Sequence, residues 1–215
     1  MPLSPELIDM LKIGSGIFWT LVYILIIKHG FQDHTCGMPL PALAGNLAWE
    51  FTFSCLLPPR APAIYINVVW LALDLVILAQ LLRFGKNALK NILPGNWFYL
   101  ALLLAMVTAF GAVLTVTFEF QDWDGIYSVF GINLMMSILF VVMLLQRKDI
   151  AGQSMYIAIF KMIGTLLPSI LFFALYPGSP LLNFLYVMIL IFDWLYIFLL
   201  YAKHREVGVN PWTRL

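Results

Sequence analysis

Apolar residues occur along this chain in seven long stretches, separated by short segments rich in polar residues, proline or glycine. The stretches cover residues 11–28, 41–57, 64–84, 97–118, 126–146, 154–176 and 181–203. A helix of about 20 apolar residues crosses a bilayer, and lipid offers no hydrogen-bond partner to backbone groups outside a helix or closed barrel. The pattern therefore predicts seven transmembrane helices, of which the second is the shortest.

The segments between these stretches are short and contain residues that end helices, such as the prolines of residues 58–62. Short connections favour antiparallel packing of consecutive helices. No repeat of 20–50 residues divides the chain. We therefore expect residues 1–215 to form a single all-α integral membrane domain, a bundle of seven transmembrane helices.

Composition strengthens this prediction. Of 215 residues, 62% are apolar and 11% are charged, whereas soluble domains have about 45–50% and about 25%. A soluble fold of this length cannot bury so much apolar surface, so a soluble enzyme is excluded. The net charge of +1 provides no basic surface for a phosphate backbone, so we expect membrane lipids and no nucleic acid as partners.

Basic residues are distributed unequally between the two sides of the predicted bundle. One side has nine: Lys28, Arg83, Lys86, Lys90, Arg147, Lys148, Lys203, Arg205 and Arg214. The other side has only Lys12 and Arg60. The positive-inside rule then places the N-terminus outside or in the lumen and the C-terminus in the cytosol. A bacterial cell membrane and a fungal endoplasmic reticulum both fit this topology.

Four charged residues lie away from the ends of the apolar stretches, namely Glu50, Asp74, Lys161 and Asp193. A charge at the bilayer centre costs about 2.5–3.5 kcal/mol on insertion scales, so each needs a partner or a function. For Asp74, the sequence allows two interpretations: an ion pair with Lys161, or a direct functional role.

Helical spacing places polar and aromatic residues on the same faces as the three carboxyl groups. We expect these faces to converge on one interior pocket: Asn46, Trp49 and Glu50; Trp70 and Asp74; Tyr186, Asp193 and Tyr196. The fourth stretch is expected to add Thr108, Gly111, Thr115 and Glu119. An apolar site favours the neutral form of a carboxyl group, which can then act as a general acid. Aromatic faces stabilise a developing cation, so the pocket suits cation chemistry on a polyene or a proton relay in a transporter.

Three segments carry a resemblance to a known family. The segments Gly45-Asn-Leu-Ala-Trp49-Glu50-Phe-Thr-Phe-Ser54, Asp193-Trp-Leu-Tyr196 and Pro211-Trp212 resemble the membrane-embedded terpene cyclases of meroterpenoid and indole-terpenoid biosynthesis, the pyripyropene- and paxilline-cyclase type known in fungi and bacteria. The resemblance implies that an epoxide or terminal alkene of a prenylated aromatic or indole substrate is protonated and cyclised without a metal ion. The family's two essential acids correspond to Glu50 and Asp193.

The predicted site follows from both arguments. Glu50 and Asp193 are the catalytic candidates, and which is acid and which is base stays open. The substrate-binding candidates are Asn46, Trp49, Trp70, Asp74, Tyr186 and Tyr196. We expect no metal and no cofactor, because the DDxxD, DxDD and HExxH patterns do not occur. The expected partner is a lipophilic prenylated small molecule.

Several other residues are given ordinary structural interpretations. Asp122 and Asp124 are predicted to form a solvated acidic turn, and His29, His34 and His204 to lie in loops without chemistry. Cys36 and Cys55 are expected on opposite sides of the membrane and therefore unpaired.

The main alternative function is a small proton-coupled transporter with seven helices. Such a transporter would favour a three-helix repeat and a Pro-Gln pair, and neither occurs here. A retinal protein needs a lysine within its last helix, and the stretch 181–203 has only Lys203 at its end. A scaffold would not need three central carboxyl groups. The substrate head group, the number of isoprene units, the stereochemistry and the oligomeric state stay open.

Overall fold

A computed structural model describes residues 3–89 and 94–215 of the chain. The described residues form seven α-helices and one π-helical turn: α1 (Pro5–Gln32), α2 (Leu40–Phe51), η1 (Thr52–Leu56), α3 (Ala63–Ala88), α4 (Phe98–Phe120), α5 (Ile126–Gln146), α6 (Met155–Leu175) and α7 (Pro180–Glu206). Each predicted apolar stretch thus contains one α-helix, and the prediction of an all-α fold is confirmed. Lys90, which contributed to the predicted orientation, lies outside the described residues.

Six of the seven helices are long and apolar enough to cross a membrane, and α2 is not among them. Its 12 residues span about 18 Å, roughly half of a bilayer core. Six full spans are thus supported, and a seventh is not shown for the second stretch, where α2 continues directly into η1. Residues 35–38, which precede α2, are buried non-helical backbone. Such backbone is tolerated at membrane depth where protein covers it.

Arg147 shows how this buried segment is stabilised. Its guanidinium donates hydrogen bonds to the carbonyl of Cys36 at 2.7 Å and to Thr35 Oγ1 at 3.4 Å. At the other end, α2 continues into η1, where Asn67 of α3 donates to the carbonyl of Phe53 at 3.3 Å. Pro58 and Pro59 follow directly and cannot supply the amide hydrogens that a longer helix requires.

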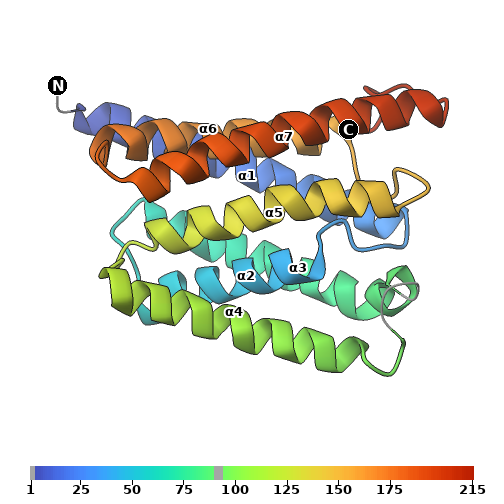
Figure 1. Cartoon of the computed structure of the whole chain (residues 1–215), viewed down its shortest axis with the longest axis horizontal. Helices are drawn as coiled ribbons and strands as arrows, with labels where there is room; N and C mark the ends of the chain where they lie inside the picture. Colours follow the sequence, from blue (N-terminus) through green and yellow to red (C-terminus); the bar gives the residue numbers. More distant parts are fainter. Residues whose placement is uncertain (1–2, 90–93) are drawn as a thin grey trace.

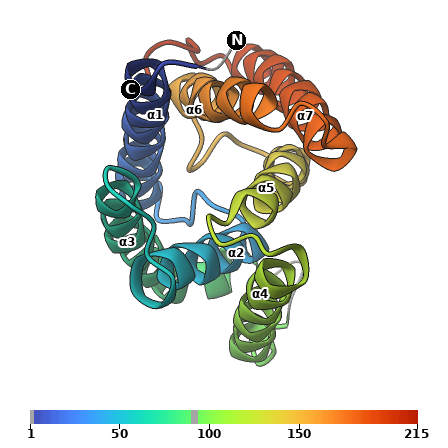
Figure 2. The same cartoon turned by 90° about the vertical axis from the view of Figure 1, so that its left-hand side faces the viewer.

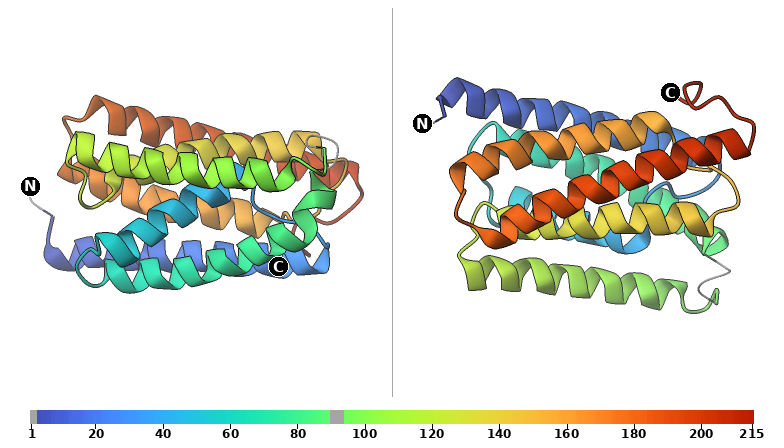
Figure 3. Two further views of the ribbon diagram at one scale, coloured as in Figure 1. Left: turned by 90° about the horizontal axis from the view of Figure 1, so that it is seen from below. Right: turned by 45° about the horizontal axis from the view of Figure 1, so that its top comes forward.

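The helices lie side by side with their connections at the two ends of the bundle (Figure 1). The end view shows α1, α3, α2, α5, α7 and α6 arranged around a central region, with α4 outside α2 and α5 (Figure 2). Two further views show that the N-terminus lies at one end of the bundle, while α7 ends at the other (Figure 3). The starts of α1, α3, α5 and α7 therefore share one end, which we call the N-terminal end.

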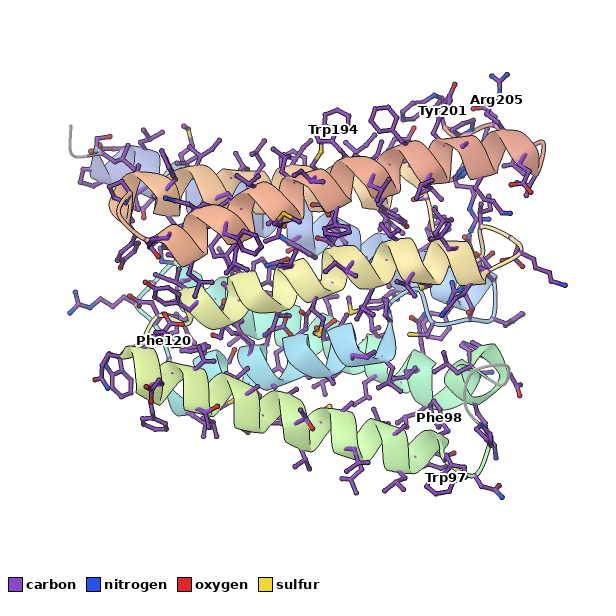
Figure 4. The ribbon with its side chains drawn as sticks, viewed as in Figure 1. Trp97, Phe98, Phe120, Trp194, Tyr201 and Arg205 are labelled. Atoms are coloured by element: carbon purple, nitrogen blue, oxygen red, sulfur yellow. The ribbon has the colours of Figure 1, made fainter. Side chains whose placement is uncertain are left out.

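The outer surface of the helices is apolar. Leu103, Leu104 and Val107 on α4 are exposed, as are many large apolar side chains of α7. Exposed aromatic side chains occur at both ends of α4, with Trp97 at one end and Phe120 at the other (Figure 4). Exposed apolar faces with aromatic ends are typical of helices in contact with lipid.

The prediction that one polar face of α4 lines the interior pocket is wrong. Thr108, Gly111, Thr115 and Glu119 are exposed, whereas Val113 and Thr117 face the bundle. The Thr115 hydroxyl donates to the carbonyl of Gly111 at 2.7 Å within the same helix. Because this bond satisfies the hydroxyl locally, the residue needs no interior partner.

Local interpretations of the acidic turn and the histidines also need correction. Asp122 is buried, and its carboxylate accepts hydrogen bonds from the backbone amides of Ile126, Tyr127 and Ser128 at 2.7–3.3 Å. It therefore caps the start of α5, where free amides and the helix dipole favour an anion. His29 and His204 are not in loops, since they lie buried in α1 and α7.

Candidate active site

A cavity of about 690 Å³ lies inside the bundle, lined by residues of α1, α2, α3, α5 and α6 and of the connections at the N-terminal end. This volume falls within the range of about 300–1,000 Å³ that is usual for small-molecule sites. Six polar or aromatic side chains of its lining come from α1, α2 and α3: Trp19, Tyr23, Asn46, Trp49, Glu50 and Trp70. Four of the eight predicted site residues thus line one cavity, namely Asn46, Trp49, Glu50 and Trp70.

Glu50 is held in place by a chain of hydrogen bonds between α1 and α2. Tyr23 donates its hydroxyl proton to Glu50 Oε1 at 2.9 Å, and Asn46 Nδ2 donates to the Tyr23 hydroxyl oxygen at 2.8 Å. Glu50 is only 2% exposed. Within residues 3–89 and 94–215, its second oxygen, Oε2, has no hydrogen-bond partner. One carboxyl oxygen is therefore fixed by a protein donor, and the other is buried without one.

Tyr23 is the functional residue that the sequence reasoning missed. It lies on α1, which has no charged residue near its centre, so no buried carboxyl group marks this helix in the sequence. A signal was nevertheless present, because Lys12, Ser15, Trp19 and Tyr23 follow one another at helical spacing. All four side chains line the cavity.

Asp74 lies directly beside Glu50 and not beside Lys161. The two carboxyl groups are neighbours in the interior, and Asn46 is a further neighbour of Asp74. In the part of the chain that the structure describes, neither oxygen of Asp74 receives a hydrogen bond from an N–H or O–H donor. The alternative of an Asp74–Lys161 pair is therefore wrong, and Asp74 supports Glu50 from outside the cavity lining.

Asp193 occupies a different position from the one expected. Its Oδ1 forms a buried ion pair with Lys161 Nζ at 2.5 Å, and Lys161 also donates to Ser137 Oγ at 2.6 Å. The described lining of the cavity does not include Asp193. Lys161 and Asp193 lie on the packed helices α6 and α7. Because their side chains meet there, they form an ion pair in which each compensates the buried charge of the other.

Of the four aromatic candidates, Trp49 and Trp70 line the cavity, whereas Tyr186 and Tyr196 are not part of its described lining. Trp49 Nε1 donates to the carbonyl of Gly125 at 2.9 Å, and Trp70 Nε1 donates to Thr20 Oγ1 at 3.2 Å. These bonds fix two indole rings in the cavity wall.

Tyr186 and Tyr196 lie behind the wall. The Tyr186 ring packs edge-on against Phe130, which lines the cavity, with their centroids 4.6 Å apart. Tyr196 is in the main core, where its hydroxyl donates to Gln153 Oε1 at 3.0 Å. The expectation that all eight residues converge on one pocket is therefore wrong for Asp74, Tyr186, Asp193 and Tyr196. Asp193 and Tyr196 are bonded to Lys161 and Gln153 instead. The Asp74 carboxyl group and the Tyr186 hydroxyl are buried without a hydrogen-bond partner among the described residues.

The inner end of the cavity thus combines a carboxyl group with indole and phenol rings, whereas its N-terminal end is lined by Lys12, Arg60 and Asp124. The cavity therefore offers a positioned acid and aromatic faces next to apolar walls. Among the described residues, no three His, Cys, Asp or Glu side chains lie close enough together to hold a metal ion. Cys36 and Cys55 are both free.

Comparison with known proteins identifies relatives of this chain. The family model of Pyr4-like transmembrane terpene cyclases matches residues 3–206. The Pyr4-family terpene cyclase mfmH of Annulohypoxylon moriforme is 30% identical over 176 residues, which cover 80% of this chain and 72% of the relative. Asnovolin H synthase nvfL of Aspergillus novofumigatus is 25% identical over 230 residues, covering 97% and 93%.

A third relative, the terpene cyclase macJ of Penicillium terrestre, is 27% identical over 164 residues, covering 74% of this chain and 64% of its own length. No solved structure matches the chain. The family match extends over nearly all of the chain, including the four predicted residues that line the cavity. The chain is a multi-pass membrane protein that belongs to the Pyr4-like transmembrane terpene cyclases.

Proposed function

We propose that the protein protonates an epoxide or terminal alkene of a prenylated aromatic or indole substrate and guides its cyclisation, without a metal ion or cofactor. The observation that carries this proposal is Glu50, which lines the cavity with one oxygen held by Tyr23 and the other without a partner among the described residues. A positioned acid facing an apolar cavity meets the requirements of general acid catalysis.

In the proposed reaction, Glu50 gives its proton to the epoxide oxygen or to a terminal alkene carbon. The resulting positive charge moves along the polyene as each new carbon–carbon bond forms from the next double bond. Trp19, Trp49 and Trp70 line this part of the cavity, and their faces stabilise the charge without supplying a lone pair that would end the reaction. Loss of a proton from the last cation gives a product that is an isomer of the substrate.

Asp193 is the second proposed acid–base residue, as the family resemblance implies. Its Oδ1 is engaged with Lys161, and its Oδ2 has no hydrogen-bond partner within the described residues. We assign Asn46 and Asp74 to the support of Glu50, and Trp49, Trp70, Tyr186 and Tyr196 to the shape of the aromatic wall. A lipophilic prenylated molecule that partitions into the membrane is the proposed substrate.

The proposed orientation has the N-terminal end of the bundle outside or in the lumen. The basic residues Lys28, Arg147, Lys203 and Arg205 all lie near helix ends at the opposite side of the bundle. The positive-inside rule supports a cytosolic location for that side. Both a bacterial cell membrane and a fungal endoplasmic reticulum fit this arrangement.

The proposal is tested with membranes that contain the protein. They are incubated with farnesylated and geranylgeranylated indoles and phenols, each as the alkene and as the terminal epoxide, in heavy water. A new product with the elemental composition of the substrate is expected by mass spectrometry. Deuterium retained on a newly protonated carbon would indicate alkene protonation, and its absence would indicate epoxide opening.

The matched control is the Glu50→Gln variant, which keeps the size of the side chain but has no acidic proton. It should insert and fold like the wild type and form no product. Full activity of this variant at equal expression would remove Glu50 from the mechanism. A chelator added to the wild type should leave turnover unchanged, and a loss reversed by one metal ion would contradict the metal-independent reaction. Uptake without isomerisation would instead favour a small proton-coupled transporter.

A further inference from the structure

The cavity is polar at both ends, and one face of α1 connects them. Lys12, Ser15, Trp19 and Tyr23 line the cavity at helical spacing. Eleven residues separate Lys12 from Tyr23, which corresponds to about 16 Å along the helix axis. The acid at Glu50 is therefore at one end of an elongated site, and a second polar region lies at the other end.

Two of the three charged residues that line the N-terminal end of the cavity are cations. Lys12 of α1 and Arg60 of the α2–α3 connection line it together with Asp124 of the α4–α5 connection. The described residues form three ion pairs, and neither Lys12 nor Arg60 takes part in any of them. Lys12 is partly buried, whereas Arg60 and Asp124 are exposed. This end therefore has two cations for one carboxylate.

Among the described residues, no neighbouring group forms an ion pair with Lys12: Asp9, one turn earlier on α1, is exposed and takes part in none of the three ion pairs. The hydroxyl of Ser15, one turn along α1, donates to the carbonyl of Gly164 at 2.7 Å and is thereby engaged. The rest of the cavity near this end is formed by prolines and large apolar or aromatic side chains, including Pro58, Pro59 and Trp123. A partly buried ammonium group within such walls is best stabilised by an anionic partner.

We propose that Lys12 and Arg60 bind an ionised oxygen of the substrate head group, a carboxylate or a phenolate, while the isoprenoid chain extends along α1 to Glu50. This inference rests on the proposed function, because it assigns the orientation and class of the same substrate. It favours prenylated aromatic acids and acidic phenols over prenylated indoles. A neutral indole would bring no anion to the partly buried Lys12.

The orientation has a chemical consequence. With the head group fixed at the N-terminal end, the terminal isoprene unit reaches the acid first, and the growing cation remains between the indole rings of Trp19, Trp49 and Trp70. The charged end thus sets which double bond is protonated. Loss of the head-group contact should weaken substrate binding and should affect the chemical step much less.

The test uses three terminal epoxides with the same farnesyl chain, attached to a hydroxybenzoic acid, to its methyl ester and to an indole. The protein is reconstituted in zwitterionic lipid, so that no anionic lipid competes for the cations. We expect the wild type to have the lowest KM for the acid. Because a charge-assisted hydrogen bond contributes about 1.5–3 kcal/mol, Lys12→Gln or Arg60→Gln should raise that KM by about 10- to 100-fold, with kcat nearly unchanged.

Matched variants make the result specific. Lys148→Gln removes an exposed cation at the opposite end of the bundle and should leave all three KM values unchanged. Arg60→Lys keeps the charge and should lose less affinity than Arg60→Gln. Binding of a non-reactive acid with a saturated chain, followed by tryptophan fluorescence, gives a second readout that does not depend on turnover.

Two outcomes would overturn the inference. Equal KM values for the acid and the ester in the wild type would show that the ionised oxygen is not recognised. A loss of affinity for all three substrates in Lys12→Gln would point to general damage of the cavity. In both cases cyclisation itself would still support the proposed function, whereas failure of the wild type to convert any of these substrates or the panel above would contradict the proposed function.

Discussion

At the residue scale, hydrogen bonds fix one of the two carboxyl oxygens of Glu50. Oε1 accepts from Tyr23, which in turn accepts from Asn46. Tyr23 also packs edge-on against Trp70, with ring centroids 6.3 Å apart. This packing holds the phenol ring independently of its hydroxyl group, so the hydroxyl can be removed without removing the ring.

The Tyr23→Phe variant tests Tyr23 as a positioning residue. The ring remains, but Glu50 loses its donor and can rotate, so kcat should fall by about tenfold with little change in KM. The measurement is steady-state turnover of the best substrate, with thermal stability of the purified variant as the control for folding. Unchanged kcat at normal stability would contradict the positioning role.

The Asp74→Asn variant tests the contact between the two carboxyl groups. Two adjacent carboxyl groups in an apolar site are most stable when they share a proton. An asparagine amide in the same place can donate to Glu50 and favour its anion, so the variant should stay folded and lose about tenfold in kcat. Turnover is measured beside Asp74→Glu, which retains an acid and should keep more activity. Wild-type turnover of Asp74→Asn would limit Asp74 to packing.

The sequence predicted site residues correctly where they lie on one face of the same helix. Asn46, Trp49 and Glu50 lie on a single face of one helix, so spacing alone brought them together. Tyr23 was missed because its partner comes from another helix. Asp193 was assigned to the pocket because nothing in the sequence shows that its carboxylate forms an ion pair with Lys161 on α6. Contacts between helices depend on their rotation and depth, which periodicity does not specify.

At the element scale, the Lys161–Asp193 pair connects α6 with α7, and Ser137 adds α5 to the contact. Removal of one partner from a buried ion pair leaves an uncompensated charge and costs about 3–5 kcal/mol. Loss of activity in Asp193→Asn alone therefore has two explanations, a chemical role or a structural one.

A double variant separates these explanations. Lys161→Met together with Asp193→Asn removes both charges, so thermal stability should return toward that of the wild type. If Asp193 is an acid–base residue, as proposed, turnover should remain absent. Recovery of both stability and turnover in the double variant would show that Asp193 only compensates Lys161.

Helix prediction was accurate for type and number and less accurate for α2. Apolar runs bounded by prolines, glycines and charges located all seven α-helices. Residues 35–38 were expected in a connection, and they are non-helical, but the sequence did not show that they are buried, because burial of a connection depends on contacts such as those of Arg147. The exposed face of α4 was misassigned for a related reason, since threonine hydroxyls can bond within their own helix.

At the scale of the whole molecule, the alternation of helices places the α5–α6 and α6–α7 connections at opposite ends of the bundle (Figure 1). Lys148 is exposed in the first connection, and Gly178 is exposed in the second with open space around its Cα. A cysteine at either position should be tolerated and accessible from one side of the membrane.

The natural cysteines interfere little with such an experiment. Cys55 is exposed and is replaced by serine. Cys36 is buried in the α1–α2 connection, and this burial raises the pKa of its thiol to about 11. Its thiol therefore stays protonated near pH 7, where only the thiolate reacts with maleimides. The Cys55→Ser variant should consequently show almost no labelling and serves as the parent.

Labelling of sealed endoplasmic reticulum microsomes with a membrane-impermeant maleimide then tests the orientation. If the basic end of the bundle is cytosolic, the Lys148→Cys variant should react in intact microsomes. The Gly178→Cys variant should react only after detergent opens them. Lys12, Arg60 and the charged end of the cavity lie at the N-terminal end, as Gly178 does. This result would therefore place the proposed head-group site on the lumenal side. Glu50, which is bonded to Tyr23, would lie about 16 Å deeper, as measured along α1. The reverse labelling pattern would contradict the orientation and would move the head-group site to the cytosolic surface.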